Sequence, residues 1–450
     1  MKVVIIGGNP AGLSAGSIIK RTNPDWEIDI YEKDKYVSYG SCGIPYYVAK
    51  SIDKLDKLVT LTKEKLEKRG LAVHLYHEVV SVDFNQKNVN VKDINGEKQF
   101  VKEFDYLVIA TGGKARITEE LLPNNPRVFL VHTLHHAERL RNFLEKEQVK
   151  TVVIIGGGYI GLEMLEAYLA QGVKGENITV IGPRLVFKSS MQEIIQKNLE
   201  KHGINALLNS RVKKIESKSK NELVVILNDG VKIRTDLVQV SIGVNPATEM
   251  FKDSKLKMLP NGAIITDEYM QTNIPRVYAA GDCIASYHII KKNHMHIPLA
   301  PAANKQGKIA GSHIAGRKID PFPGIIGTAI FKVINQYCAM TGINQQEATE
   351  LGYNAQIALI ENNEIAHYYP GGGKMTVQLI FDSESHLLLG AEIIAPSVLG
   401  AKKIDVLATA ITARMRIEDI QKLDLAYAPP FAPVWDPILI AANVARKKCS

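Results

Sequence analysis

The chain has few cysteines and no long apolar run, and both absences narrow its class. Only four of its 450 residues are cysteine, and none of them forms a CxxC pair. The sequence therefore offers neither a zinc knuckle nor a thioredoxin-type motif, and we expect no metal site. Sparse cysteine suits a reducing compartment. Apolar runs such as 151–156 are much shorter than the roughly 18 residues of a membrane span, so we expect no membrane partner.

The sequence also lacks the marks of a secretory leader and of a nucleic-acid surface. Residues 1–6 run directly into a glycine-rich turn, which is typical of mature structure rather than of a signal peptide. A cytoplasmic location is therefore expected. The formal net charge is +8, but the basic residues are dispersed among acidic, serine and apolar ones. Such charge steers phosphorylated ligands at most, and no nucleic-acid partner is expected.

The first 32 residues match a dinucleotide-binding unit. In that unit, backbone amides and a helix N-terminus bind a pyrophosphate, and an acid takes the ribose hydroxyls. Asn9 replaces the middle glycine of the turn, and we expect the turn to survive because asparagine tolerates positive φ. The expected parts are a buried strand (2–6), a glycine turn (Gly7 to Gly12), a helix (13–21), a second strand (27–31) and the acid (Glu32).

A second unit of the same kind follows about 120 residues later along the chain. Its glycine turn matches the full fingerprint, and two such units imply two dinucleotides. Gly182 stands where the ribose-binding acid belongs; without that acid a 2′-phosphate is not repelled, and Arg184 can pair with it. With Lys188 nearby, we predict NADPH and leave NADH open. The expected parts are strand, turn, helix and strand: 152–155, Gly156 to Gly161, 162–171 and 178–181.

Two strand-then-turn segments, 106–112 and 277–282, flank the second unit. Together with the glycine turns they resemble the large family of flavoproteins with two dinucleotide-binding domains, over residues 1 to about 325. The resemblance implies FAD on the first turn, an inserted NAD(P)H domain, and Asp282 at the ribityl or pyrophosphate region. It implies these cofactor contacts: Gly7, Gly12, Glu32, Lys33, Ser41, Val80, Thr111, Gly112, Gly156, Gly158, Tyr159, Ile160, Gly161, Glu163, Arg184, Gly243, Gly281, Asp282, Pro298 and Ala300.

Two residues of the second unit resemble family residues on the nicotinamide side. Tyr159 is similar to the aromatic that covers the flavin until nicotinamide displaces it, and Glu163 to the glutamate that contacts the nicotinamide amide. The structural alternatives are core packing for Tyr159 and an exposed helix charge for Glu163.

Cys42 is the candidate for the chemistry. It lies in the segment SYGSCGIPYY, which begins six residues beyond Glu32. Tyr47 occupies the position of the second cysteine of ordinary disulfide reductases, so Cys42 has no local partner. A single thiol can cycle through a mixed disulfide, a persulfide or a sulfenic acid. We expect the helix that follows to lower its pKa. The alternative is a buried structural cysteine.

These residues resemble the single-cysteine branch that contains coenzyme A-disulfide reductases, NADH oxidases and NADH peroxidases. The likeness covers the whole chain, including 298–316 and 327–342, and implies a C-terminal dimerisation domain. Oxidases and peroxidases of the branch place a histidine in the first turn, where this chain has Pro10. The resemblance is therefore closest to coenzyme A-disulfide reductase.

The branch also implies substrate contacts. Its disulfide reductases carry two tyrosines that act across a dimer interface, and Tyr427 and Tyr369 are our candidates, with Tyr368 as the fallback. Coenzyme A-binding members carry an arginine on the first helix where this chain has Ile18, and an asparagine where it has Ser41. Other disulfides and persulfides therefore stay open. The remaining substrate candidates are Lys20, Arg21 and Ser38.

The expected protein is an α/β homodimer with two Rossmann-like, three-layer domains and an α+β dimerisation domain. Its expected function is FAD-dependent reduction of a low-molecular-weight disulfide, above all coenzyme A disulfide, by NADPH or NADH through Cys42. The alternatives are an NADH oxidase or peroxidase acting through a sulfenic acid, and a redox sensor with negligible turnover. The predicted domains are FAD-binding, NAD(P)H-binding, FAD-binding again and dimerisation: 1–116, 117–244, 245–325 and 326–450.

Overall fold

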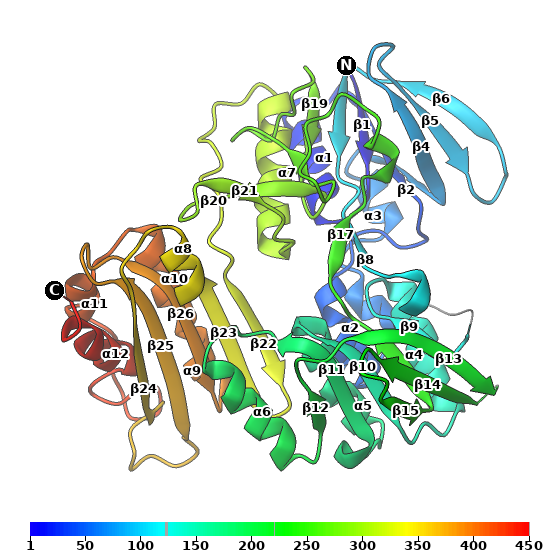
Figure 1. The fold of residues 1–450 in the computed structure, drawn as a ribbon. Helices are drawn as coiled ribbons and strands as arrows, with labels where there is room; N and C mark the ends of the chain where they lie inside the picture. The colour runs from blue at the N-terminus through cyan, green and yellow to red at the C-terminus, as the bar shows by residue number, and fades with distance from the viewer. Residues whose placement is uncertain (122–124, 220, 450) are drawn as a thin grey trace.

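Two parallel sheets and one antiparallel sheet organise the chain. Figure 1 shows the computed structural model, which describes residues 1–121, 125–219 and 221–449. The two parallel sheets lie on the right of the view, one above the other, and the antiparallel sheet lies at the lower left, with the C-terminus.

The first parallel sheet is assembled from segments on both sides of the second one. Its strand order is β19-β7-β1-β2-β3. The pairing of β19 with β7, Val277 against Leu107, closes the sheet after the chain has made the second unit. Helices α1 and α7 cover one face, and the hairpin strands β4, β5 and β6 lie beyond β2 and β3 (Figure 1). The bounds are β1 Lys2–Ile6, α1 Pro10–Thr22, β2 Glu27–Glu32, α3 Lys63–Glu67, β3 Ala72–Leu75, β4 His77–Asp83, β5 Asn88–Asp93, β6 Gln99–Glu103, β7 Tyr106–Ile109, β18 Ile264–Ile265, β19 Val277–Ala279, β20 Ile284–His288, β21 Asn293–Met295 and α7 Ala300–Ile314.

The second parallel sheet has the order β12-β11-β10-β16-β9. Its three central strands, β11, β10 and β16, are mostly apolar and buried over the residues that pair, as a sheet covered on both faces requires. A two-stranded link of β8 and β17 joins it to the first sheet (Figure 1). The bounds are β8 Gly113–Ala115, β9 Val128–Leu130, α4 Leu134–Lys146, β10 Val152–Gly157, α5 Tyr159–Ala170, β11 Ile178–Leu185, α6 Met191–Lys201, β12 Asn205–Leu207, β13 Val212–Ser219, β14 Glu222–Leu227, β15 Lys232–Thr235, β16 Leu237–Val240 and β17 Val244–Pro246.

The C-terminal sheet is antiparallel throughout, in the order β22-β23-β26-β25-β24. Short helices pack on it, and their apolar residues share a core with the sheet. The predicted fold class is confirmed, while the domain limits stay a prediction. The bounds are β22 Ala329–Val333, β23 Gln336–Gly342, α8 Gln345–Glu350, β24 Ala355–Asn363, β25 Lys374–Asp382, β26 Leu388–Ala395, α9 Val398–Lys402, α10 Ile404–Thr412, α11 Ile417–Gln421 and α12 Pro437–Arg446.

Several elements are longer than predicted, among them α1 and β11. Helix α1 begins at Pro10, three residues earlier than expected, because proline at the first helical position needs no N–H partner. Strand β11 runs four residues past its predicted end, since a register shift lets Leu185 pair with Gly157. Gly182 therefore lies inside β11, and the end of the first glycine turn, Gly12, lies inside α1.

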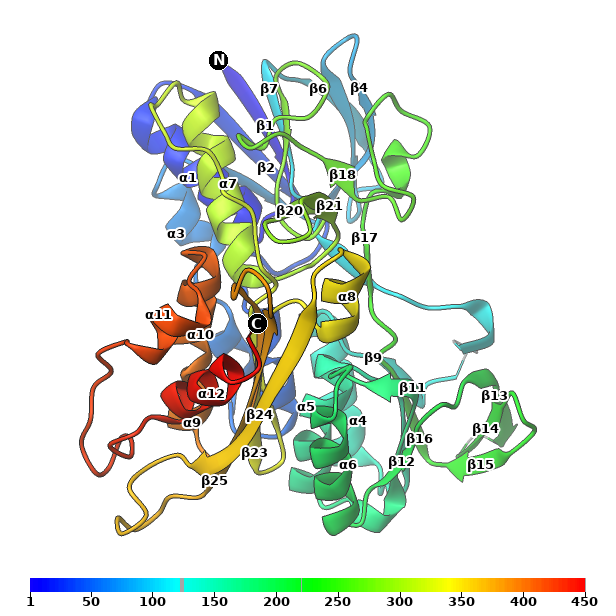
Figure 2. The ribbon, with the colours of Figure 1, turned by 60° about the vertical axis from the view of Figure 1, so that its left-hand side comes forward.

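Helices α1 and α7 approach each other closely, and Figures 1 and 2 both show them side by side. A β-carbon on Gly307 would lie 2.1 Å from the carbonyl oxygen of Ala11, and one on Gly311 would lie 2.5 Å from that of Ala15. Glycine on α7 is thus required by packing. Within the described residues, no helix is long and apolar enough to cross a membrane.

Replacing Gly311 with alanine should destabilise the protein by about 1–3 kcal/mol, because the added methyl group forces the backbones of α1 and α7 apart. The thermal unfolding midpoint of the variant measures the effect. Gly40→Ala is the control: Gly40 has φ −90°, and no described atom lies within 4 Å of its would-be β-carbon. Equal stability of the two variants would show that the helix contact is not tight.

Candidate active site

The two glycine turns are held by the same close contacts. Gly7 and Gly156 have φ of 109° and 113°. A β-carbon on either would lie 2.1 or 2.2 Å from a carbonyl oxygen just past the neighbouring strand, β7 or β16. One on Gly12 or Gly161 would lie 2.1 or 2.0 Å from the carbonyl oxygen of the first glycine of its turn. Only glycine fits these four positions.

The helices that begin at these turns leave their first amides open. The N-cap residues Asn9 and Gly158 make no side-chain cap on α1 or α5. A pyrophosphate can therefore take these N–H groups. We expected Asn9 to be tolerated because asparagine accepts positive φ, and that reason was wrong. Its φ is −108°, an extended conformation that needs no special residue. Its side chain instead accepts the backbone N–H of Tyr39 at 3.2 Å.

The first unit offers polar groups that fit FAD. Glu32 is buried and accepts the backbone N–H groups of Gly8 at 2.9 Å and Asp34 at 3.1 Å. Burial raises its pKa. The hydroxyl oxygen of Thr111 is buried and has no hydrogen-bond partner among the described residues. Next to it, Gly112 has φ 71° and open space beside it. An unpartnered hydroxyl beside the pyrophosphate turn suits a polar ligand such as FAD.

The loop before Cys42 is attached to the first glycine turn. Ser38, with φ 55°, donates its backbone N–H to the carbonyl oxygen of Gly8 at 2.9 Å. Tyr39 donates to Asn9, one residue further along the same turn. Cys42 then lies in a single 3-10 turn, Ser41–Gly43, which continues into α2, Ile44–Val48. These bonds fix the thiol relative to the dinucleotide turn.

Cys42 is surrounded by negative charge. The residue as a whole is exposed, but its thiol is partly desolvated, and this desolvation together with the carboxylates of Glu163 and Asp282 raises its pKa. A hydrogen bond with Ser41 opposes the rise without cancelling it. We expected the following helix to lower this pKa, and that expectation was wrong for the chain alone. Helix α2 has only five residues, and its dipole is outweighed by two carboxylates.

Glu163 and Asp282 bring charge from two other parts of the chain. Glu163 lies on α5 of the second unit, and burial raises its pKa to about 7. Burial also raises the pKa of Asp282, against the opposing effect of His132 and His296. Glu163 is thus a half-buried group that faces the thiol, rather than an exposed helix charge.

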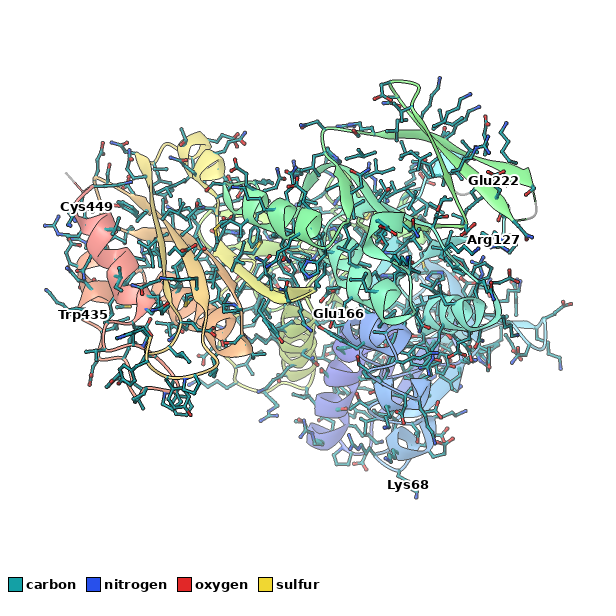
Figure 3. The ribbon with its side chains drawn as sticks, turned by 90° about the horizontal axis from the view of Figure 1, so that it is seen from below. Lys68, Arg127, Glu166, Glu222, Trp435 and Cys449 are labelled. Carbon is teal, nitrogen blue, oxygen red and sulfur yellow. The ribbon has the colours of Figure 1, made fainter. Side chains whose placement is uncertain are left out.

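Tyr159 packs on the C-terminal unit. Its ring meets the ring of Phe331 edge-on at 5.1 Å, and its hydroxyl donates to the sulfur of Met340 at 3.2 Å. The side chain remains 36% exposed, so Tyr159 is not a core residue. Two helical turns further along α5, Glu166 binds Lys332 at 2.6 Å. Figure 3 labels Glu166 close to where the three parts of the ribbon meet.

The end of β11 and the loop after it hold the residues predicted to select the dinucleotide. Gly182 is buried and Arg184 is exposed. Lys188, which we placed nearby as a second cation, is not free: its ammonium lies 3.1 Å from a carboxylate oxygen of Glu347 in the C-terminal unit. Gly243, on the neighbouring loop, has φ 114° and open space beside it.

The structure pairs Tyr427 with Tyr368. Their hydroxyl oxygens lie 3.1 Å apart, and both residues are exposed. The carbonyl oxygen of Pro429 accepts the backbone N–H of Ala366, which ties the two loops together. No hydrogen bond of the described residues joins Tyr369 to Tyr427, so our fallback now fits better than our first choice. In Figure 1 the loop between β24 and β25 that carries Tyr368 lies at the lower left, well apart from α2.

Lys20 stays a prediction as a substrate residue, and in the structure its side chain already has partners. Its ammonium donates to the carbonyl oxygens of Pro24 at 2.6 Å and Trp26 at 2.9 Å. It lies near the C-terminal end of α1, about 15 Å along the helix from the glycine turn. Arg21 donates to a carbonyl oxygen of its own helix and is exposed. Among the other candidates, four are exposed: Lys33, Ser41, Gly158 and Ala300. Three more are half-buried: Val80, Ile160 and Pro298.

Three neighbours of the site were not predicted. His132 and His296 act on Asp282, and the phenol of Tyr46 has its pKa raised by burial and by Glu163, Glu166 and Cys42. Tyr46 lies four residues after Cys42 on nearly continuous helix, and that spacing is the one signal that pointed to it. The histidines come from distant loops and carry no local signal. Among the described residues, no group of three or more potential ligands could hold a metal ion.

Comparison with known proteins agrees with this geometry. The pyridine nucleotide-disulphide oxidoreductase family matches residues 1–307. The chain belongs to this family. The dimerisation domain of the same family matches residues 328–437. The resemblance inferred from the glycine turns and the cysteine segment is confirmed, and the protein is an oxidoreductase that uses FAD and NAD(P)H.

Three relatives cover nearly the whole chain. The NAD(P)H coenzyme A polysulfide/persulfide reductase of Pyrococcus horikoshii is 40% identical, over 99% of this chain and 98% of its own. The structure of an NAD-dependent persulfide reductase from A. fulgidus, 34% identical, superposes with a TM-score of 0.94 over 100% of this chain and 83% of that one. The water-forming NADH oxidase of Lactobacillus brevis, bound to NADH, is 28% identical, with a TM-score of 0.93 over 100% and 98%.

Replacing Glu163 with glutamine should lower the pKa of Cys42, since it removes one of the two carboxylates that disfavour the thiolate. The rate of alkylation by iodoacetamide, measured against pH on the holoenzyme, should then rise at lower pH than in the unmodified protein. Glu138→Gln, on α4, is the control and should leave the profile unchanged. A Glu163→Gln profile that stays in place would remove Glu163 from the surroundings of the thiol.

Proposed function

We propose that the protein reduces coenzyme A-linked disulfides or persulfides with NAD(P)H, and that Cys42 forms the mixed disulfide. The observation that carries the proposal is the position of one lone thiol between the two units: its loop is bonded to the first glycine turn, and Glu163 of the second unit faces it. The name of the Pyrococcus horikoshii relative supports the substrate class.

The proposed reaction begins with the thiolate of Cys42. It attacks one sulfur of the substrate, so that one sulfur–sulfur bond forms, another breaks, and the second thiol leaves as an anion. FAD and the nicotinamide supply the two electrons that release the bound thiol from Cys42. Glu163 and Asp282 disfavour a free thiolate, so the chain holds the proton on sulfur until a partner takes it. Glu163, with a pKa of about 7, is the group that can accept that proton.

Tyr427 and Tyr368 are the proposed proton donors to the leaving thiolate. The hydrogen bond with Tyr368 raises the pKa of Tyr427, so the phenol stays protonated at neutral pH. Because their loops lie far from α2 of the same chain (Figure 1), we place them at Cys42 of a second copy. The C-terminal unit exposes large apolar side chains that a second copy would cover: Leu399, Phe431, Val434 and Trp435, of which Figure 3 labels Trp435 at the outer edge.

The proposed dinucleotide is NADPH, with NADH as the alternative. Arg184 is exposed at the end of β11, and the buried Gly182 offers no carboxylate to repel a 2′-phosphate. The engineered variant of the Lactobacillus brevis oxidase that is bound to NADPH lost an aspartate and gained two arginines, which supports the same reasoning.

Oxygen reduction is the second candidate, since the oxidase from Lactobacillus brevis has a nearly superposable chain. Against it stands Pro10, the first residue of α1, which has no proton to give or take. Steady oxygen uptake with NADH and without added thiol would favour the oxidase. Slow turnover with every acceptor would instead favour a redox sensor.

The first test is the intact mass of the purified protein under non-reducing, denaturing conditions. We expect an adduct with the mass of one coenzyme A on the Cys42 peptide, released by reductant. Cys42→Ser should lose the adduct and all disulfide reduction, while bleaching of the flavin by NADPH continues. An oxygen adduct together with rapid oxygen consumption would move the protein to the oxidases.

Tyr427→Phe and Tyr368→Phe should each lower kcat for disulfide reduction, Tyr427→Phe by about 10²-fold, as expected for loss of a general acid. Flavin reduction by NADPH should not change. Tyr369→Phe is the matched control on the same loop and should stay near the unmodified rate. If Tyr369→Phe were the damaging change instead, the tyrosine that pairs with Tyr427 in the structure would not be the one that acts.

A further inference from the structure

The loop that follows β11 is fastened to the C-terminal unit along its whole length. Phe187 is fully buried and packs on Phe331 at 5.9 Å. The residues after it each reach a different element of the C-terminal unit. These contacts are Lys188 to Glu347 at 3.1 Å, Ser189 to Glu392, and Ser190 to Gln378 at 3.3 Å. The backbone beside Arg184 is therefore held in place by a unit that contains neither glycine turn.

Glu347 is the residue where the three units meet. It lies on α8 and also accepts the backbone N–H of Asn344, in a capping box. The same carboxylate oxygen that binds Lys188 lies 3.2 Å from the ammonium of Lys291, which follows β20 in the first unit. Burial opposes the charge of Glu347, but these bonds outweigh it and lower its pKa. Glu347 is therefore ionised at neutral pH.

We propose that Glu347 withholds Lys188 from the 2′-phosphate of NADPH and so sets the balance between NADPH and NADH. This inference rests on the proposed function, because it takes the loop after β11 as the seat of the adenosine ribose. Lys188 stands six residues after Gly182, in the loop that follows β11, and Arg184 lies near the end of that strand. Unpaired, it would be a second cation for the phosphate beside Arg184; paired with Glu347, it is neutralised.

The second lysine makes an exchange of partners possible. The side chain of Lys188 is 40% exposed, whereas that of Lys291 is 14% exposed and stays against Glu347. If Lys188 turns toward a phosphate, Glu347 keeps one cation and is not left as an unpaired, half-buried charge. Phe187, Ser189 and Ser190 hold the backbone meanwhile, so that only the lysine side chain has to move. NADPH must then compete with Glu347 for Lys188, and NADH need not.

Glu347→Gln tests the proposal in the FAD-containing dimer. Glutamine keeps the acceptor oxygen of the capping box but not the charge. The ratio of kcat/KM for NADPH to that for NADH should rise about two- to fivefold, the value of a surface ion pair released to another anion. Binding of adenosine 2′,5′-bisphosphate, measured by calorimetry, should tighten similarly, while binding of adenosine 5′-monophosphate stays constant.

Two further variants define the outcome. Glu350→Gln removes the same charge from the exposed end of α8, where Glu350 bonds only Gln346 at 2.8 Å in the described structure, and should leave the ratio unchanged. Lys188→Ala should abolish the gain of Glu347→Gln and change the unmodified protein little. A ratio that stays constant or falls in Glu347→Gln would overturn the inference. Such a result with normal flavin reduction would leave the proposed function intact, whereas absence of NAD(P)H oxidation in the unmodified protein would remove the function itself.

Discussion

The attachment of the cysteine loop to the first glycine turn is the constraint on which the rest of the site depends. Two backbone N–H groups, of Ser38 and Tyr39, reach the turn, one at a carbonyl oxygen and one at the side chain of Asn9. The turn is the proposed site of a pyrophosphate, so the same few bonds would place the thiol at a fixed distance from the dinucleotide. Asn9, which replaces the middle glycine of the fingerprint, therefore helps to connect the glycine turn with the loop that carries Cys42.

Once the thiol is fixed there, the carboxylates decide its chemistry. Desolvation, Glu163 and Asp282 raise the pKa of Cys42, and the pKa of Glu163 itself is raised to about 7. Both shifts favour the protonated form, so the thiol of Cys42 keeps its proton at neutral pH. A lone thiol kept protonated is also slow to oxidise, because the thiolate is the reactive form. Both glycine-turn units take part in this control, since Glu163 belongs to the second.

The sequence allowed prediction of what is local or sterically forced, and less of what depends on distant contacts. The glycines at positions 7 and 156 could be predicted from the sequence pattern because any β-carbon there would clash with a carbonyl oxygen. Both Rossmann-like units and the cysteine segment followed from such patterns. The pKa of Cys42 was predicted with the wrong sign because its causes depend on the fold: they are desolvation first, and then the charge of Glu163, which lies 121 residues away in the chain. Lys20 and Lys188 look like free cations in the sequence, and only the folded chain shows the oxygens that they bind.

The C-terminal unit serves both ends of the site through one sheet. Its far loops hold Tyr368 and Tyr427, while the opposite side of the same unit binds Tyr159 through Met340 and the loop after β11 through Glu347 and Glu392. One antiparallel sheet lies between these contacts. Through it, the position of the loop after β11 would be coupled to the surface that a second copy would cover. Substitutions in this unit can therefore alter dinucleotide choice without touching either glycine turn, and a change of dinucleotide preference need not map to the residues that contact the dinucleotide.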